Sequence, residues 1–272
     1  MALSDLVDID RYPIDRPATE NYSSLVTQAR QELARDGVCV LDGFVRPDAI
    51  ARILPRFDAI EQFAFHAVKQ HNVYLRSDDP EFDDDHPRNA KQTTTSATLG
   101  YDHARTVLEL DGLYRSDEIR SFVAAALGHD VLYRYEDALA PMSALFYPPG
   151  SQLGWHVDNS IFTVTIMLRE AVGGAAFEYV PFLLDGDDMA FDRVAEIVAG
   201  GRVGVRSLVQ SAGTLVLFRG SRTLHRVTTV TGSVTRLLAT LSYSPEPGTR
   251  LSAINQRTFY GRAIDGIREP TS

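Results

Sequence analysis

The sequence predicts a mainly β protein, a jelly roll of about eight short strands preceded by helices. The chain has 272 residues, 44% of them hydrophobic, which is enough to bury a large core within one domain. Apolar residues recur at helical spacing in the first half, whereas β-branched and aromatic residues recur in short segments thereafter. We expect one domain over 1–272, with a helical portion and lid (1–130), a barrel core (131–245) and a C-terminal extension (246–272).

The first half should contain, in order, a helix over 22–35, a strand over 38–41, a helix over 48–69, a solvated loop or lid over 77–91 and a helix over 116–127. The first helix ends at Asp36-Gly37, a typical C-cap. Pro55 should kink or divide the second helix. The loop holds five Asp, one Glu and two Pro, a composition that disfavours regular structure.

The second half should form strands over 131–135, 141–147, 160–168, 175–180, 207–210, 213–218, 225–230 and 234–243, with an acidic helix near 188–199. Gly232-Ser233 would suit a type II′ turn that joins the last two strands as a hairpin. That hairpin would pair His225 with Thr240 and set Arg236 opposite Thr229, on the same face as His225.

Charge and cysteine content exclude several classes of function. The net charge is -9 with a pI near 5.2, so nucleic acid and anionic membranes are disfavoured as partners. The single cysteine, Cys39, excludes an internal disulfide and any Cys-rich metal site, and it fits a reducing compartment. The acidic N-terminus does not resemble a signal peptide, and no apolar run has the length of a membrane span. We therefore expect a cytoplasmic protein.

The only His-x-Asp triplet of the chain is His156-Val157-Asp158. In a strand these two side chains point to the same face, so they can bind one ion together. His225 follows the apolar segment 213–218 and would complete two imidazoles and one carboxylate, the ligand set of non-heme Fe(II). The triplet alone is weak evidence because chance supplies it at comparable frequency. A surface turn and an ordinary strand histidine remain the alternatives.

Arg236 is the candidate clamp for an anionic cosubstrate. In the hairpin register it lies about 13 Å along the strand from His225, at roughly 3.3 Å per residue. That gap suits a five-carbon diacid with one end on the metal and the other on a planar guanidinium. An exposed strand arginine is the alternative, but the neighbours Leu237, Leu238 and Leu241 disfavour it.

His156-x-Asp158, His225 and Arg236 together resemble the signature of the Fe(II)/2-oxoglutarate-dependent oxygenase superfamily, whose fold is a cupin-like double-stranded β-helix. The segments 34–45 and 147–159 resemble its helix–strand opening and the approach to its metal motif. The resemblance implies Fe(II) as metal, 2-oxoglutarate as cosubstrate and O2 as oxidant. The segments 86–89, 174–181 and 257–262 resemble a bacterial subgroup that acts on free amino acids and other small metabolites. This subgroup includes hydroxylases and amino-acid halogenases.

The resemblance also implies roles for single residues. Leu238 stands where the family often has Ser or Thr, so the second partner of the distal carboxylate is open. The candidates are Tyr147, which matches a cosubstrate-binding tyrosine of prolyl-hydroxylase-like members, and Thr163, Thr165 and Thr228. Candidates for the substrate pocket are Arg88, Asn159, Thr240, Ser242 and Phe259 or Tyr260. Halogenating relatives have Gly or Ala in place of the carboxylate ligand, so Asp158 favours hydroxylation, desaturation or ring formation over chlorination.

The function predicted from the sequence is therefore a dioxygenase that hydroxylates an unactivated carbon of a small metabolite, with release of succinate and CO2. The metabolite would be a free amino acid or a natural-product intermediate. Three alternatives are a protein or peptide hydroxylase of the same superfamily, a cupin-like metal-binding protein that does not use 2-oxoglutarate, and a catalytically silent binding domain. Arg236 separates the 2-oxoglutarate users from the cupin-like protein, because only a 2-oxoglutarate user needs a cation at that position. A silent binding domain would fold but form no succinate with any substrate.

Overall fold

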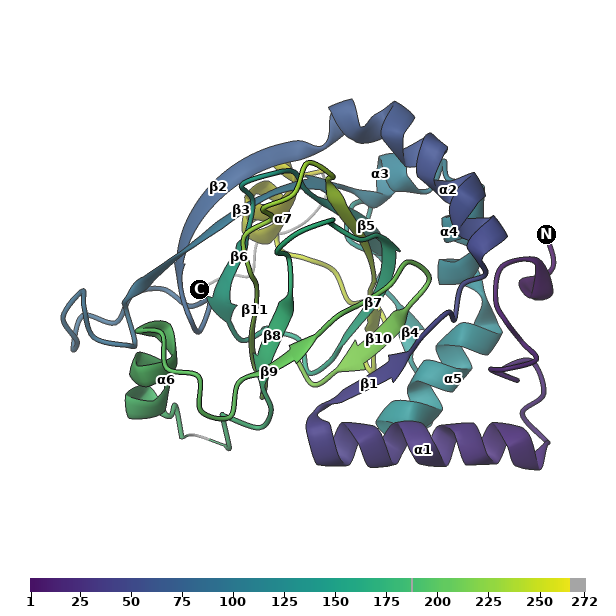
Figure 1. Cartoon of the computed structure of the whole chain (residues 1–272), viewed down its shortest axis with the longest axis horizontal. Helices are drawn as coiled ribbons and strands as arrows, with labels where there is room; N and C mark the ends of the chain where they lie inside the picture. Colours follow the sequence, from purple (N-terminus) through teal and green to yellow (C-terminus); the bar gives the residue numbers. More distant parts are fainter. Residues whose placement is uncertain (187, 265–272) are drawn as a thin grey trace.

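Two antiparallel sheets face each other at the centre of the molecule (Figure 1), in a computed structural model that describes residues 1–186 and 188–264. The major sheet has the order β1 (Val38–Leu41), β10 (Leu215–Phe218), β7 (Thr163–Arg169), β12 (Arg236–Leu241), β5 (Met142–Tyr147), β3 (Lys91–Leu99) and β2 (Phe65–Asn72). The minor sheet has the order β6 (Leu153–His156), β11 (Leu224–Val227), β8 (Phe177–Val180) and β9 (Arg206–Leu208). A short pair joins β13 (Tyr243–Ser244) to β4 (Tyr133–Arg134).

From β5 to β12 the chain passes back and forth between the two sheets. β5, β7, β10 and β12 belong to the major sheet, and β6, β8, β9 and β11 belong to the minor sheet. This connectivity is that of a double-stranded β-helix, which confirms the predicted fold. The first 130 residues add β1, β2 and β3 to the major sheet as well as helices, so that part of the chain is less purely helical than predicted.

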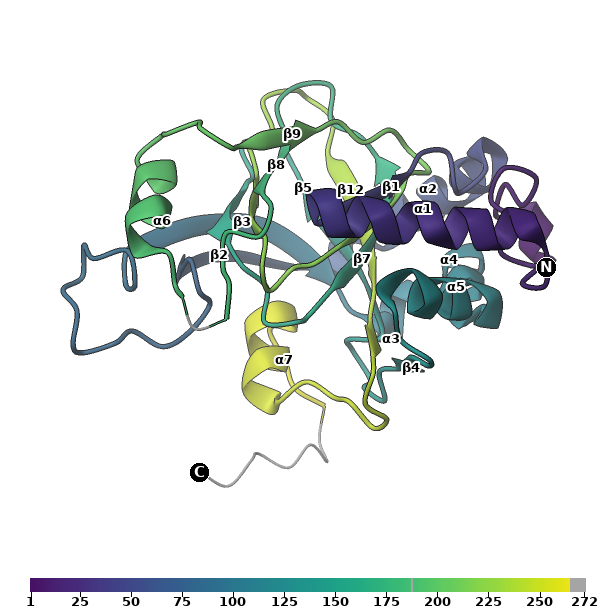
Figure 2. The ribbon, with the colours of Figure 1, turned by 90° about the horizontal axis from the view of Figure 1, so that it is seen from below.

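Helices cover the outer face of the major sheet and close the molecule on two sides. The helices are α1 (Glu20–Asp36), α2 (Pro47–Ile60), α3 (Tyr101–Ala104), α4 (Leu108–Arg115), α5 (Asp117–Leu127), α6 (Phe191–Val198) and α7 (Ala253–Tyr260), with 3-10 turns at Leu3–Asp5 and Glu61–Phe63. α1, α2, α4 and α5 lie on one side of the barrel and α6 on the other (Figure 1), while α7 lies below it in Figure 2. Among the described residues, no helix is long and apolar enough to span a membrane.

Several predicted boundaries are confirmed. α1 ends at Gly37, which adopts the left-handed conformation (φ 70°) of a C-cap, and β1 covers the predicted range. α5 begins after Ser116, whose side chain accepts a hydrogen bond from the Ile119 amide. Pro55, by contrast, does not divide the helix, because α2 continues through it to Ile60.

The helix predicted over 48–69 is wrong beyond Ile60. Residues Phe65–Asn72 instead form β2, which pairs with β3 along its whole length. The two patterns are hard to separate because the apolar residues at 57, 60 and 64 fit a helix, whereas exposure from residue 65 onward alternates with the period of a strand. β3, α3 and α4 are further elements that the sequence did not predict.

The predicted hairpin around Gly232-Ser233 is also wrong. β11 pairs with β6 and β8 in the minor sheet, whereas β12 pairs with β5 and β7 in the major sheet. The amides of Thr231 and Gly232 both donate to the Gly173 carbonyl, so this segment packs on the loop after β7. A Cβ on Gly232 would lie 2.9 Å from the Gly173 nitrogen, so glycine here permits the approach of two backbones.

Candidate metal centre

The described residues contain one cluster able to hold a metal ion, formed by His156, Asp158 and His225. One ligand atom from each residue can be chosen so that all three lie within 4.8 Å of one another. Cross-strand pairing places His156, at the end of β6, opposite His225 in β11, and Asp158 follows β6 by two residues. The Nε2 atoms of the two histidines lie 3.4 and 3.6 Å from Oδ1 of Asp158. The sequence therefore predicted a triad that the fold brings together.

Backbone carbonyls fix both imidazoles in one orientation. Nδ1 of His156 lies 2.8 Å from the Gly154 carbonyl, and Nδ1 of His225 lies 2.8 Å from the Thr223 carbonyl. Because a carbonyl only accepts, each Nδ1 carries the proton and each Nε2 presents its lone pair. This is the tautomer that a metal-binding histidine needs, and a second hydrogen bond of this kind commonly orients such ligands.

The charges of the triad also suit a cation. Burial and the neighbouring His156 lower the pKa of His225 to about 4, so this imidazole is neutral near pH 7. Burial raises the pKa of Asp158, whereas His225 and His156, in their protonated forms, and the Thr163 hydroxyl lower it, and the lowering is the larger effect. The cluster therefore offers two imidazole nitrogens and one carboxylate, the donor set of a non-heme Fe(II) site.

Two further residues hold the Asp158 carboxylate. The Thr163 hydroxyl donates to Oδ2 at 2.6 Å, so this threonine orients the metal ligand Asp158. The structure therefore favours this role over the predicted role of Thr163 as a partner of the cosubstrate carboxylate. Gly220 lies on the other side of the carboxylate, where a Cβ would come within 2.3 Å of Oδ2. The Asp158 amide donates to the Gly220 carbonyl at 3.0 Å, which keeps the two segments together.

Arg236 lies inside the barrel and is only 2% exposed. It pairs across the strands with Tyr147 in β5, and its guanidinium carbon lies 5.3 Å from the centre of that ring. Nη2 donates to Oε1 of Gln210 at 3.1 Å, whereas Nη1 is buried without a hydrogen-bond partner among the described residues. A buried cation with a free N–H fits the carboxylate of a diacid.

Tyr147 is buried beside Arg236 on the inner face of β5. Burial, which is the largest effect, raises the pKa of Tyr147; Arg236 opposes this shift and the Asp158 carboxylate adds to it. The phenol therefore lies within electrostatic reach of both Arg236 and Asp158, as expected of a residue beside a ligand that spans the two.

The other two candidates for the cosubstrate carboxylate lie on opposite faces. Thr165 is buried in β7 with the parity of Thr163, which faces the triad. Thr228 has the parity of Arg226, which lies on the outer face of the minor sheet over the Trp155 ring. The Thr228 hydroxyl accepts from the Ala176 amide at 2.9 Å, so the structure does not bring Thr228 to the clamp.

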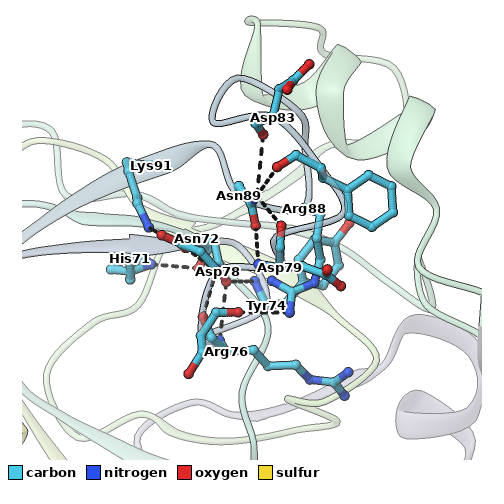
Figure 3. Close-up of polar contacts among 12 residues, drawn as sticks. His71, Asn72, Tyr74, Arg76, Asp78, Asp79, Asp83, Arg88, Asn89 and Lys91 are labelled. Atoms are coloured by element: carbon cyan, nitrogen blue, oxygen red, sulfur yellow. Dashed lines mark hydrogen bonds and ion pairs between the residues drawn. The ribbon is translucent and has the colours of Figure 1, made fainter.

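Arg88 belongs to the acidic loop, whose polar contacts stay within the loop and the adjoining end of β2 (Figure 3). Its Nη2 donates to the Ser77 carbonyl at 2.9 Å, and the nearby Asn89 side chain donates to the carbonyls of Asp79 and Phe82. Phe82 and His86 of this loop stack and pack against Phe191 of α6. The loop is thus joined to α6 on the outside of the minor sheet, and its contacts do not bring Arg88 to the triad.

Of the remaining candidates for the substrate pocket, some lie at the barrel interior or near the triad, whereas Ser242 lies away from it. Thr240 faces the barrel interior opposite Ser143, whose hydroxyl lies 2.7 Å from the Tyr260 hydroxyl of α7. Phe259 precedes that tyrosine and is 41% exposed at the rim. Asn159 is exposed beside Asp158. Ser242 lies past the end of β12, where its carbonyl accepts a hydrogen bond from the Tyr114 hydroxyl, outside the triad.

Sequence reasoning missed Gln210 and Gly220. Gln210 follows β9 and reaches Arg236 from the opposite sheet, a contact for which no sequence spacing gives a signal. Gly220 follows the last residue of the apolar strand β10 by two positions, and a glycine near a strand end is a weak sign of close backbone approach.

Comparisons with known proteins agree with this fold. The family model of Halogenase D (HalD) matches residues 22–258. No match was found among curated proteins. A 2OG-Fe(II) oxygenase family oxidoreductase from Burkholderia pseudomallei is 16% identical, with a TM-score of 0.50, over 81% of this chain and 91% of that chain.

Two further solved structures share the fold. The epimerase SnoN in complex with Fe3+, α-ketoglutarate and nogalamycin RO is 15% identical, with a TM-score of 0.57, over 81% of this chain and 84% of that chain. A prolyl hydroxylase from Trichoplax adhaerens, in complex with a hypoxia-inducible-factor peptide, is 15% identical, with a TM-score of 0.53, over 83% and 91% of the two chains. The chain belongs to the Halogenase D family and has the double-stranded β-helix fold of the 2OG-Fe(II) oxygenases.

Proposed function

We propose that the protein is an Fe(II)- and 2-oxoglutarate-dependent oxygenase that hydroxylates an unactivated carbon of a small metabolite. The observation that carries this proposal is the guanidinium of Arg236, buried in the barrel with an unpartnered Nη1. An unpaired buried cation is costly, so its retention favours an anionic ligand as the missing partner. A cupin-like protein that binds only a metal has no use for that cation.

Each residue then has a defined task. His156, Asp158 and His225 would hold Fe(II), which supplies the activation of dioxygen when bound. Arg236 would donate two parallel hydrogen bonds to the distal carboxylate of 2-oxoglutarate and would position the other end of this diacid towards the triad. Thr163 keeps the Asp158 carboxylate turned towards the two imidazoles. The burial of the two histidines and of Arg236 excludes bulk water from the reacting centre.

Oxygen transfer is favoured over chlorination even though the family model is that of Halogenase D. In halogenating members of the superfamily a small residue replaces the carboxylate ligand, which gives room for chloride. Here Asp158 occupies that position and is held there by Thr163 and Gly220. The proposal therefore assigns hydroxylation to this chain, with desaturation and ring formation as the related outcomes of the same site.

The proposed substrate is a small molecule and the proposed compartment is the cytoplasm. Cys39 is buried as a free thiol, and a reducing compartment would also keep the iron as Fe(II).

The first test is binding under anaerobic conditions. The protein should take up one Fe(II) and, on addition of 2-oxoglutarate, develop a weak visible charge-transfer band. His225→Ala should lose the band, whereas the matched control His66→Ala, on an exposed position of β2, should keep it. A band at full strength in His225→Ala would contradict the assignment of this ligand.

The second test is the mass of the product. Mass spectrometry of products formed in chloride buffer should find added oxygen, a new double bond or a new ring, and no chlorine. A chlorinated product from the unmodified protein would overturn the assignment of Asp158 as an iron ligand.

A further inference from the structure

Lys69 stands out in a chain that has 25 arginines and only two lysines. It lies in β2, directly opposite Thr94 of β3. Thr98 is opposite Phe65 on the same ribbon and pairs with Leu145, which lies on the inner face of β5. Residues of one strand parity share a face, so Lys69 points to the inner side of the ribbon, while its neighbours Val68 and Gln70 are exposed.

The inner face of this ribbon leads to the metal cluster. His71 follows Lys69 by two residues in β2 and lies on the same face of the strand. Its Nε2 lies 2.8 Å from the Thr94 hydroxyl. The His71 ring is 6.0 Å from the ring of the metal ligand His156. Two strand residues span about 7 Å, so Lys69 stands one same-face position beyond His71. Lys69 and the metal ligand thus lie at the two ends of one short stretch of this face, a span of the size of a small substrate.

Within residues 1–186 and 188–264, no carboxylate pairs with Lys69. Its ammonium makes no hydrogen bond or ion pair with any of these residues, and it lies over the face of the Phe259 ring, 4.8 Å from the ring centre. Burial lowers the pKa of Lys69 to about 8, so the amine is still mostly protonated near pH 7. The other lysine, Lys91, is ion-paired with Asp78. A desolvated cation without an anion is costly, and a bound anion would remove that cost.

Phe259 places this ammonium at the entrance of the barrel. The adjacent Tyr260 is anchored to Ser143 on the inner face of β5, and Gly261 packs on the Phe65 ring at the start of β2. Helix α7 therefore contacts both β5 and β2 at one end of the barrel (Figure 2). Phe259, in the last turn of this helix, contacts the Lys69 ammonium. An apolar ring and an ammonium side by side suit a ligand with an anionic head and a carbon skeleton.

We propose that Lys69 binds an anionic group of the substrate, a carboxylate or a phosphate, with Phe259 packed against the adjoining carbons. This inference rests on the proposed function, because it assumes that 2-oxoglutarate binds at Arg236. The substrate then binds on the other side of the metal cluster, beside β2 and α7. The substrate is then a small organic anion whose charged group stays at the rim while the carbon to be oxidised reaches the triad.

The two lysines allow a direct test by competitive labelling. The protein is loaded with Fe(II) and saturating 2-oxoglutarate without oxygen, acetylated with limiting acetic anhydride, and mapped by peptide mass spectrometry. Acetate, benzoate and inorganic phosphate serve as anionic probes, and acetamide and benzamide as uncharged counterparts. At least one anion should slow acetylation of Lys69 severalfold, the amides should not, and labelling of Lys91 should stay constant. Protection by benzoate or by phosphate separates the two anion classes.

Variants supply the second arm. Lys69→Met should weaken binding of the protecting anion by about tenfold or more, and Lys69→Arg should restore most of it. Lys91→Met is the matched control and should bind as the wild type does. Acetylation of Lys69 that no anion slows, or equal slowing at both lysines, would overturn the proposal.

The two proposals can fail separately. If 2-oxoglutarate binding does not depend on Arg236 while anions still protect Lys69, the proposed function fails and the anion site stands. If the Fe(II)–2-oxoglutarate band forms normally but Lys69 is never protected, the function stands and the substrate site is wrong.

Discussion

A methyl group added at Gly220 would collide with the proposed iron ligand. A Cβ built at this position lies 2.3 Å from Oδ2 of Asp158, and 2.8 and 2.9 Å from its Cβ and Cγ. Non-bonded carbon and oxygen atoms do not approach so closely, and Gly220 does not have the positive φ that would add backbone strain. Gly220→Ala therefore tests the position of the Asp158 carboxylate alone.

The size of the effect follows from the distances. To restore ordinary contact the carboxylate oxygen must move by about 1 Å, whereas metal–ligand distances are held to about ±0.2 Å. The shift would also pull Oδ2 away from the Thr163 hydroxyl. We expect Gly220→Ala to bind Fe(II) about 10- to 100-fold more weakly, the usual cost of disturbing a residue that orients a ligand. The overpacking should cost about 1–3 kcal/mol of folding free energy.

Anaerobic equilibrium dialysis with Fe(II) measures the affinity, and circular dichroism melting measures the folding. Gly112→Ala, in helix α4, is the matched control, because a Cβ there would meet only ordinary contacts at 3.5 Å with the side chains of Met1 and Leu6. Asp158→Ala, which keeps only the two histidine ligands, gives the Fe(II) affinity expected when the carboxylate is lost altogether. A folded Gly220→Ala protein with wild-type Fe(II) affinity would refute the position of Asp158 in the site.

Three further outcomes follow from the same geometry. Arg236→Leu should weaken 2-oxoglutarate binding by on the order of 3 kcal/mol, about a hundredfold, and spare Fe(II) binding; Arg169→Leu, which removes a surface ion pair, is the control in calorimetric titration. Thr163→Val should weaken Fe(II) binding about tenfold without a specific effect on 2-oxoglutarate, and a loss matching that of Arg236→Leu would return Thr163 to the cosubstrate. Only the unprotonated amine reacts with anhydride, and burial lowers the pKa of Lys69 to about 8. The rate of Lys69 labelling in the folded protein should therefore rise through pH 8. If the midpoint pH of this rise is the same in protein unfolded in urea, the fold does not desolvate the amine.

The triad could be predicted because its information is local. His156 and Asp158 lie two residues apart at the end of one strand, and the apolar strand before His225 identifies its context. Helix ends such as Gly37 and Ser116 were predictable for the same reason, since a cap depends on a few neighbouring residues.

Features that depend on contacts between sheets could not be predicted. Gln210 meets Arg236 across the barrel, and Gly220 meets Asp158 between two loops, so neither pair has a fixed spacing. At Gly232 the sequence instead predicted a feature that the structure does not contain. A glycine that permits close backbone approach and a glycine that makes a tight turn look alike in sequence, and the hairpin inferred from it was wrong.

The hairpin was wrong, yet Arg236 lies inside the barrel, and the reason is the layer of helices. Leu237, Ala239 and Leu241 alternate with Arg236 along β12 and are fully or almost fully buried in the core beneath the helices. Each leucine buried there contributes about 1.5–3 kcal/mol, and a slip of one residue would expose these side chains to the polar interior and turn Arg236 into the core. The apolar face therefore fixes the rotation of β12. The clamp is positioned by residues that never contact a ligand.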